Sequence, residues 1–436
     1  MISQAEIQGF SGVFLNPASH TDKDCYVIGQ IISVRKLGKR LVFVIVKTPY
    51  GEIQCVSANR DCEIPNTGSY ARFSGRLIEN TDVVTGIKGF ELNFSFIDTI
   101  SVAEKHLSLE DISTGARRTR IENRHLDLRN SKTSAIFSVR SSLMKYSHAF
   151  FSQEGFTFVN SPRLVGEIVG GPVSALHLDY FGKPCYLSIA SILYHGIMIS
   201  GGMEKVFEVG PLFRGSNTNT SISANEFTVA EYTAAYYDRN DMMDLTQQYI
   251  NYVLNGLSLN CQRELNDLGI DIDLFSREFQ TITFREAISL LNSNGYSLDW
   301  KAITELPKTS IEVFAKYFNG FFWILDQPES RKWFFVEDAL VDGEVMSRDF
   351  QLWHASFPRI AEGSERLIDV HKLEAKLASR GLTSDDFLFY LQAIKHGTAP
   401  FSGMGVGIER LLMLILKADN IRDVILFPRD PNTLIP

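Results

Sequence analysis

The sequence is short of the residues that cross-link small domains or bind metals through sulfur. Its 436 residues include five cysteines, an odd number with no Cys-x-x-Cys spacing: Cys25, Cys55, Cys62, Cys185 and Cys261. A disulfide framework needs paired cysteines, and a thiolate zinc site needs closely spaced ones. The sequence therefore predicts neither, assigns no metal site, and fits a reducing, cytoplasmic environment.

We expect neither a signal peptide nor a membrane span in this sequence. The opening residues, MISQAEIQGF, have neither the basic start nor the apolar stretch of a secretory signal. Residues 184–203 contain no Asp, Glu, Lys or Arg, but Pro184, His195 and several serines and glycines interrupt them. These residues indicate a buried core segment rather than a bilayer span. We expect a soluble protein with no membrane partner.

An excess of positive charge is missing too. The formal net charge is −8 at pH 7, so the overall composition does not indicate nucleic-acid binding. A local basic face can still form on an acidic protein, and this class of function stays open. With 44% hydrophobic and 22% charged residues over 436 positions, the chain is long enough for two or three domains.

Short β-branched and aromatic runs fill the region from Tyr26 to about Ser101. They include YVIGQIISV, RLVFVIV, EIQCV, YARFSGRLI and FELNFSFIDTI, and turn signals such as TPYG and PNTG separate them. About five strands at this spacing predict a small closed barrel or a sandwich, which we assign to residues 1–105.

The rest of the chain changes in character twice. Residues 106–135 are rich in charge, with RRTRIENRHLDLR near their centre, and predict a polar linker that is helical in part. Residues 136–436 mix helical and strand-like patterns without regular βαβ alternation. This mixture favours an α+β domain built on a largely antiparallel sheet.

The most specific local pattern lies near the C-terminus, in SGMGVGIERLLMLIL. Gly403, Gly405 and Gly407 alternate along a predicted strand, which clears one strand face for a flat ligand. Arg410 follows in the first turn of an apolar helix, where its charge and the helix N-terminus both favour an anion. The spacing is not that of a dinucleotide-binding loop. The competing interpretation is a glycine-containing strand that simply packs on a helix.

Three stretches occur in the order of the three signature motifs of class II aminoacyl-tRNA synthetases: FFSQEGFTFVNSPRLV, VFEVGPLFRGSNTNTSISANEFT and GMGVGIERLLMLIL. RHLDLRN, DYFGKPCYL and ILFPRDP strengthen the match. Together these stretches extend the likeness over nearly the whole chain, which most resembles the aspartyl/asparaginyl branch. The resemblance implies an α+β fold, with an N-terminal OB-fold β-barrel for anticodon binding and a class II antiparallel-sheet catalytic domain.

The resemblance also implies an ATP site. Arg214 matches the motif 2 arginine that contacts the α-phosphate and the carboxylate being activated, and Phe227 matches the ring that stacks on adenine. Arg410 matches the motif 3 arginine on the γ-phosphate, and the glycines of 403–407 would form the floor of the adenosine site. Arg214 and Arg410 are thus the candidate catalytic residues.

Two partners are implied as well. Pro162 matches the motif 1 proline at the dimer interface, so the resemblance implies a homodimer. Arg35, Phe43 and Gln54 stand where the branch contacts the anticodon bases of tRNA. An exposed ring on an OB fold can stack on a base. A core position is the competing interpretation for Phe43.

Motif 2 departs from the pattern of the branch. The usual Phe-Arg-Ala-Glu reads Phe213-Arg214-Gly215-Ser216, which removes the glutamate that binds the adenine amino group. The following loop usually carries a His/Arg group near the γ-phosphate and here reads Ser221-Ile222-Ser223. The motif aligns without a gap, so these differences belong to this chain.

The expected substrate pocket departs from the pattern too. Val169 replaces the acid that faces the substrate ammonium, and Ile192 replaces a glutamine of the pocket. Arg359 replaces a metal-binding glutamate and Glu362 replaces its partner serine, while Arg366 of the branch pattern remains. A buried ammonium without a partner is costly, and a fixed cation repels magnesium. Alternatively, Arg359 binds an anion in the metal's place.

These observations lead to three hypotheses. The first is a paralogue of aspartyl/asparaginyl-tRNA synthetase with a rebuilt active site, which binds tRNA or aminoacyl-tRNA and acts in a specialised amide-forming or related reaction. The second is a divergent but active ATP-dependent aspartate or asparagine ligase. The third is a non-catalytic tRNA-binding or regulatory protein. ATP remains a candidate cofactor although the motif 2 changes argue against it, and Arg359 argues against magnesium.

Overall fold

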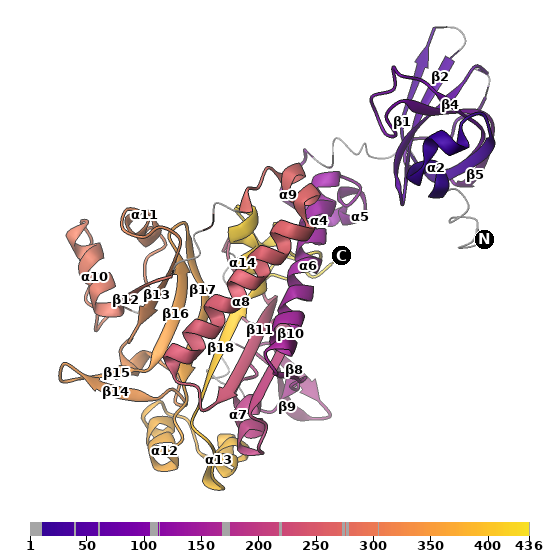
Figure 1. Ribbon diagram of the computed structural model, residues 1–436. Coiled ribbons are helices and arrows are strands. Elements are labelled where there is room, and N and C mark those ends of the chain that lie inside the picture. The colour runs from indigo at the N-terminus through magenta and orange to yellow at the C-terminus, as the bar shows by residue number, and fades with distance from the viewer. Residues whose placement is uncertain are drawn as a thin grey trace. The chain divides into compact units, whose positions relative to one another are not determined.

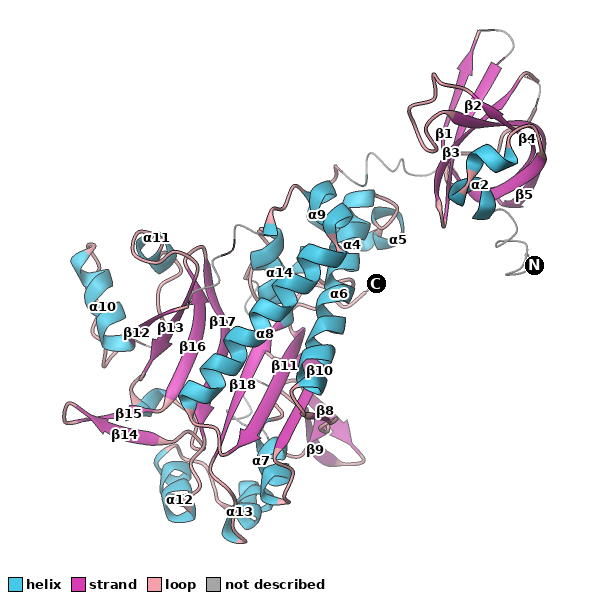
Figure 2. Ribbon diagram, in the orientation of Figure 1, coloured by secondary structure: helices cyan, strands magenta, loops and turns pink. Residues whose placement is uncertain are grey.

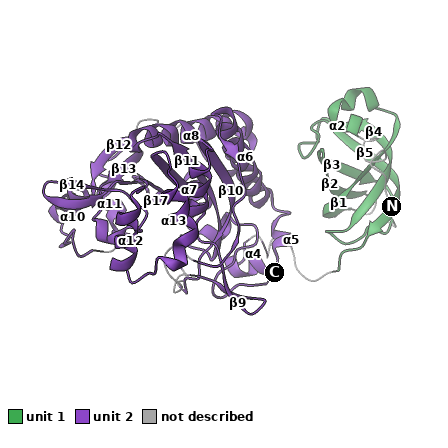
Figure 3. Ribbon diagram, turned by 90° about the horizontal axis from the view of Figure 1, so that it is seen from below, with its two compact units in different colours: residues 1–108 green, residues 109–436 purple. Residues whose placement is uncertain are grey.

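The computed structural model describes residues 11–38, 41–59, 62–104, 112, 114–167, 175–217, 220–272, 275, 279–303 and 305–435. The chain forms two compact units, Met1–Ser108 and Leu109–Pro436 (Figure 3). The boundary between the units falls near the end of the predicted barrel region. The charged stretch predicted as a linker contributes short helices to the second unit.

The first unit contains a five-stranded closed barrel with strand order β1-β2-β3-β5-β4 (Figure 1). Its elements are α2 (Ser11–Leu15), the 3₁₀ turn η1 (Pro17–His20), β1 (Asp24–Leu37), β2 (Leu41–Thr48), β3 (Gly51–Ser57), β4 (Tyr70–Glu79) and β5 (Phe90–Ser101). Along β2, the buried Val42, Val44 and Val46 alternate with more exposed residues. This period of two turns one face of the strand into the core. Of the two architectures that the sequence allowed, the structure has the barrel.

The second unit is built on an eight-stranded sheet with order β12-β13-β16-β17-β18-β11-β10-β6 (Figure 2). The strands are β6 (Thr157–Phe158), β10 (Lys205–Phe213), β11 (Glu226–Ala235), β12 (Gln280–Thr283), β13 (Phe321–Leu325), β16 (Asp349–His354), β17 (Phe357–Glu365) and β18 (Phe401–Gly407). The β6–β10 and β12–β13 pairs are parallel, and the other neighbours are antiparallel. The predicted α+β class and largely antiparallel sheet are confirmed.

Two long helices, α6 and α8, pack side by side over one face of this sheet (Figure 2). The helices of the second unit are α4 (Arg117–Glu122), α5 (Arg124–Asp127), α6 (Ser131–Gln153), α7 (Ile192–Ser200), α8 (Arg239–Asn260), α9 (Gln262–Leu268), α10 (Phe284–Ser293), α11 (Ser310–Phe314), α12 (Val370–Ser379), α13 (Leu388–Lys395) and α14 (Ile408–Leu416). Helix α8 begins at a capping box formed by Asp238 and Asp241. Leu143, Leu254 and Val406 belong to the main core between these helices and the sheet.

Smaller elements complete the second unit. They are β7 (Leu164–Val165), β8 (His177–Tyr180), β9 (Lys183–Leu187), β14 (Asp338–Val341), β15 (Glu344–Ser347) and the 3₁₀ turns η4 (Glu329–Arg331), η5 (Asp385–Phe387) and η6 (Ile421–Asp423). Residues 184–203 form most of β9 and all of α7, and they place Leu193 and Ile199 in a second core cluster. Within the described ranges, no helix has the length and apolar character needed to cross a membrane.

Candidate functional site

The middle strand of the sheet leaves one of its faces clear. On β18, Gly405 lies opposite both Glu362 of β17 and Glu231 of β11, and Gly407 lies opposite Val229 of β11. The alternate residues of β18 belong to the main core under α6 and α8, so the glycines face away from these helices. Because Gly405 and Gly407 have no side chains, β18 forms the floor of a shallow trench between β17 and β11. This glycine alternation was predicted from the sequence.

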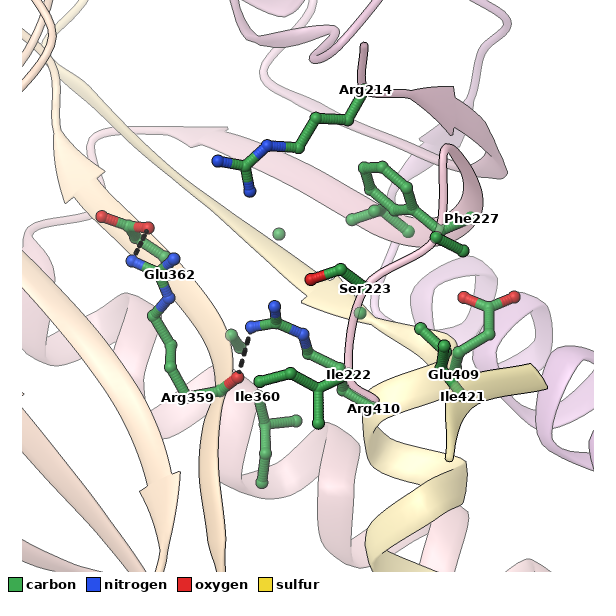
Figure 4. Close-up of a pocket in the computed structure, with 15 residues that line it drawn as sticks. Arg214, Ile222, Ser223, Phe227, Arg359, Ile360, Glu362, Glu409, Arg410 and Ile421 are labelled. Carbon is green, nitrogen blue, oxygen red and sulfur yellow. Dashed lines mark hydrogen bonds and ion pairs between the residues drawn. The ribbon is translucent and has the colours of Figure 1, made fainter. Parts of the chain in front are cut away.

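A cavity of about 220 Å³ opens over this trench (Figure 4). Six of the sequence-predicted residues line it: Arg214, Phe227, Arg359, Gly405, Gly407 and Arg410. A second lobe of about 370 Å³ shares Arg214, Arg359 and Arg410 and continues toward Lys308 and Trp353. The structure thus brings together residues that are up to 196 positions apart in the chain, from 214 to 410.

Three guanidinium groups converge on the cavity (Figure 4). Arg214 is exposed at the end of β10, and no described side chain forms a hydrogen bond or an ion pair with its guanidinium. Arg410 lies in the first turn of α14 and donates a hydrogen bond of 2.8 Å to the backbone carbonyl of Arg359. Burial lowers the pKa of Arg410 to about 10, and the cations Arg359 and Arg214 add to this effect. Cations held this close together favour a bound anion.

The loop between β10 and β11 is held by hydrogen bonds to its backbone carbonyls. The side-chain amide of Asn225 donates to the carbonyls of Arg214 and Ser216, at 2.6 and 3.0 Å, and the Arg422 guanidinium donates to the carbonyl of Thr220 at 3.0 Å. The backbone N–H of Ile421 donates to the carbonyl of Ser221 at 2.7 Å. These contacts position Ile222 and Ser223 at the cavity wall (Figure 4) without help from a charged side chain in the described part of the loop.

Glu409 anchors the start of α14 to the hairpin of β10 and β11. Its side chain is buried, and one oxygen accepts a hydrogen bond of 2.8 Å from the backbone N–H of Thr228. The other oxygen pairs with Arg140 of α6 at 2.7 Å. The sequence pattern did not reveal this role, because Arg140 lies 269 positions earlier in the chain. Glu409 therefore positions the neighbouring Arg410.

A chain of opposite charges forms the wall beside Arg359. Arg359 donates to one carboxylate oxygen of Glu362 at 2.8 Å, and the Lys332 ammonium lies 2.6 Å from the other. The same oxygen accepts a hydrogen bond of 3.3 Å from Gln351. Lys332 is buried and also pairs with Asp349 at 2.7 Å. Neither Lys332 nor Asp349 was predicted as a site residue, because no local sequence pattern connects them to the cavity.

These pairings determine the charge states of Glu362 and Lys332. Burial acts to raise the pKa of Glu362, but Arg359 and Lys332 outweigh it and hold that pKa well below its usual range. Burial acts to lower the pKa of Lys332, but Asp349 and Glu362 outweigh it and raise that pKa above its usual value. The carboxylate and the ammonium are therefore both charged near neutral pH.

Arg366 and Ile192, two other predicted substrate residues, lie outside the cavity lining. Arg366 is buried, donates to the hydroxyl of Ser364, and has its pKa lowered to about 10 by burial. A Cβ atom at Gly403 would lie 2.9 Å from an Arg366 nitrogen, so this glycine makes room for Arg366 rather than for a ligand in the cavity. Ile192 opens α7 and packs on the second core cluster. Val169 lies outside the described residues.

In the barrel, the three predicted tRNA-binding residues lie on neighbouring strands. Arg35 of β1 is paired with Phe43 of β2, and its guanidinium lies 5.3 Å from the ring centroid. Phe43 alternates with the buried valines of β2, so its ring is on the outer face rather than in the core. Gln54 of β3 donates a hydrogen bond of 2.7 Å to Glu91.

Comparison with known proteins identifies the family. A family model described as tRNA synthetases class II (D, K and N) matches residues 116–431. The chain belongs to this family. The aspartate–tRNA(Asp/Asn) ligase of Methanococcus aeolicus is 31% identical over 95% of each chain, and that of Methanocaldococcus jannaschii is 29% identical over 95% of each chain.

The fold is also similar to that of a solved synthetase structure. The asparaginyl-tRNA synthetase from Pyrococcus horikoshii, complexed with asparaginyl-adenylate, matches with a TM-score of 0.88 and 26% identity, over 96% of this chain and 97% of that chain. The OB-like barrel and the class II sheet domain inferred from the motifs are confirmed.

One departure from the class II motif 2 pattern has a clear structural reason. A Cβ atom at Gly215 would lie 2.3 Å from the carbonyl oxygen of Ala175, closer than real Cβ atoms come to another atom. The alanine that is usual at this position would therefore displace the backbone around 175. The backbone at Ala175 can approach this closely only because residue 215 is a glycine without a Cβ atom.

Class II synthetases of this branch work with ATP and magnesium, and the residues present do not fit the metal. The resemblance predicts that Arg359 replaces the metal-binding glutamate, and in the structure both oxygens of Glu362 already have donors. Among the described residues, no group of three or more His, Cys, Asp or Glu side chains could hold a metal ion. A nucleotide fits better, since the cavity offers the Phe227 ring, the glycine trench and guanidinium groups.

Proposed function

We propose that this chain is a paralogue of aspartyl/asparaginyl-tRNA synthetase with a rebuilt active site. In this proposal it binds a nucleotide, and it acts on tRNA or aminoacyl-tRNA in a specialised amide-forming or related reaction. The observation that carries the proposal is the cavity wall at Arg359, where Arg359 is paired with Glu362 while Arg214 and Arg410 line the same cavity.

The side chains divide between the parts of a bound ATP molecule. Phe227 is available to stack on the adenine ring, and Gly405 and Gly407 let the nucleoside approach the sheet. Arg214 and Arg410 are available for the phosphates, since guanidinium groups bind phosphate oxygens through paired hydrogen bonds. When bound, ATP supplies a good leaving group for the activation of a carboxylate.

A pyrophosphate exchange assay with ATP and each amino acid in turn tests this proposal. We expect ATP binding by calorimetry but no exchange above background with aspartate or asparagine. The reason is that Ile192 and Val169 stand where the branch has polar partners for the amino acid. Exchange with either amino acid would contradict the rebuilt site. Absence of ATP binding would contradict the nucleotide site itself.

The second candidate is an active, divergent aspartate or asparagine ligase. It is favoured by the similarity to proteins named aspartate–tRNA ligases, which reaches 31% identity over 95% of the chain. It is also favoured by Arg214, Phe227 and Arg410, which keep the positions that the family uses for ATP. The exchange assay separates the two candidates, because only this one predicts exchange with aspartate or asparagine.

We also propose that the barrel binds tRNA through the outer face of β2. The supporting contact is the Arg35–Phe43 pair, which offers a ring and a cation side by side. Phe43→Ala is expected to weaken tRNA binding by about tenfold at low salt, because stacking on one base contributes roughly 1–3 kcal/mol. Phe96→Ala is the control, since Phe96 is 60% exposed on another strand of the barrel. Equal losses in the two variants would contradict a specific role for Phe43.

A homodimer remains part of this proposal. Pro162 is exposed, and exposed apolar side chains also occur on β6, β7 and β8 and in the β8–β9 turn: Phe158, Leu164, Tyr180 and Phe181. Apolar surface of this kind is typical of an interface. Sedimentation velocity at micromolar concentration is expected to show twice the 49.1 kDa chain mass. A monomer under these conditions would contradict the dimer.

A further inference from the structure

The wall of the cavity contains four charged side chains in a row: Asp349, Lys332, Glu362 and Arg359. The Lys332 ammonium lies 2.7 Å from Asp349 and 2.6 Å from Glu362, and Glu362 in turn lies 2.8 Å from Arg359. Lys332 and Asp349 are buried, whereas the side chains of Glu362 and Arg359 are 38% and 32% exposed. The row therefore runs from a fixed, buried end to a partly exposed end at the ligand space.

This arrangement leaves Glu362 unsuited to a divalent cation. Magnesium binds carboxylate oxygens whose lone pairs are available, in a close octahedral shell. Both oxygens of Glu362 already receive donors, from Lys332 and Gln351 on one side and from Arg359 on the other. A metal ion here would also be repelled by Arg214, Arg359 and Arg410, which all line the same cavity.

We propose that Arg359 takes the electrostatic place of a divalent cation, so that the polyphosphate of a nucleotide binds as the metal-free anion. This inference rests on the proposed nucleotide site. When the anion enters, the Arg359 guanidinium exchanges its contact with Glu362 for phosphate oxygens. Lys332 keeps its contact with Glu362, so the carboxylate that Arg359 leaves still has a counter-ion.

The exchange is energetically favourable for two reasons. Partly exposed ion pairs such as Arg359–Glu362 contribute little to stability, because solvent screens them. Guanidinium–phosphate contacts are stronger, because they combine opposite charge with two parallel hydrogen bonds. There is also room for the anion, since the second lobe of about 370 Å³ begins at Arg214, Arg359 and Arg410 and extends to Lys308.

Calorimetric titration of the full chain with ATP, once in EDTA and once in excess magnesium, tests the inference. We expect ATP to bind in EDTA at least as tightly as in magnesium, because the metal neutralises two of the charges that the arginines recognise. A dissociation constant that falls about tenfold or more when magnesium is added would overturn the inference and leave the nucleotide site in place. No binding in either buffer would overturn the nucleotide site as well.

Two variants locate the effect at Arg359. Arg359→Gln is expected to weaken ATP binding in EDTA by about tenfold or more, while Arg118→Gln, in which an 86% exposed arginine of the same unit is changed, leaves it unaltered. Arg359→Glu combined with Glu362→Ser places the acid and hydroxyl of the family pattern in the wall. Its ATP binding is expected to require magnesium. Unchanged binding of ATP to Arg359→Gln in EDTA would overturn the proposal, and the two-buffer comparison on the unaltered chain decides it if a variant does not fold.

Discussion

Replacing Arg214 with glutamine is expected to weaken ATP binding by roughly 30- to 150-fold, or about 2–3 kcal/mol, because a charge-assisted contact with phosphate is lost. Arg214 is exposed at the mouth of the loop, and no described side chain forms a hydrogen bond or an ion pair with its guanidinium. The substitution therefore removes a ligand contact without breaking a side-chain contact to any described residue. Calorimetric titration with ATP measures the change.

Arg214→Lys is the matched control for this prediction. It keeps the positive charge but loses the planar fork, so we expect an affinity between those of the unaltered chain and Arg214→Gln. Thermal unfolding of both variants is expected to match that of the unaltered chain. If Arg214→Gln bound ATP as tightly as the unaltered chain, the phosphates would not lie where the three guanidinium groups converge, and the proposed site would be wrong.

Replacing Lys332 with methionine is expected to destabilise the second unit by about 3–5 kcal/mol, because it leaves the buried carboxylate of Asp349 without its counter-ion. Asp349 would keep only the hydroxyl of Ser347 at 2.6 Å and the backbone N–H of Gln327 at 2.8 Å. Urea unfolding followed by tryptophan fluorescence measures the effect. The signal reports the second unit, since all the tryptophans lie there: Trp300, Trp323, Trp333 and Trp353.

The pH dependence distinguishes lost charge pairing from lost packing in the Lys332→Met variant. In the unaltered chain, the pKa of Glu362 lies below its usual value of 4.5, so its contribution to stability is present above that value and lost as the pH falls through the folded pKa. In the variant, Glu362 keeps only Arg359 of the two cations that lower its pKa, so it contributes less stability above pH 4.5 than in the unaltered chain. Both proteins lose this contribution at low pH, so the difference in unfolding free energy is expected to shrink as the pH falls below about 4.5.

Lys395→Met supplies the comparison for this prediction. Lys395 pairs with Glu374 at 3.0 Å, but the two side chains are 48% and 35% exposed. Solvent screens such a pair, so its loss is expected to change stability by at most about 1 kcal/mol. If the two lysine variants lost similar stability, or if the loss in Lys332→Met did not depend on pH, the buried charge chain would not have the role assigned to it.

Much of the fold could be predicted because its signals are local. Alternating apolar residues predicted the strands of the barrel, as Val42, Val44 and Val46 show. Glycines with a period of two predicted that one face of β18 would be free of side chains. The closure of the barrel was not predictable in the same way. It depends on pairs such as β1 with β4 and β3 with β5, which join strands that are not neighbours in the sequence.

The candidate site shows the same division. Motif order predicted that Arg214, Phe227 and Arg410 would share a ligand space, and the cavity contains all three. The sequence could not show whether the space beside Gly403 would hold a ligand or a neighbouring side chain. In the structure the Arg366 guanidinium occupies that space. The contact of Gly215 with the backbone at Ala175 was equally invisible, because 40 positions separate the two residues.

By itself, the sequence determined the class II synthetase family and the fold, an OB-like barrel and an antiparallel-sheet domain, whereas the residues replaced in the family pattern stay a prediction. These are properties of short segments and of their order. Only the tertiary structure decided that Glu362 pairs with both Arg359 and Lys332, and that Lys332 also pairs with Asp349. The physical reason is that Lys332, which follows η4, reaches Asp349 of β16 and Glu362 of β17 only in the folded chain.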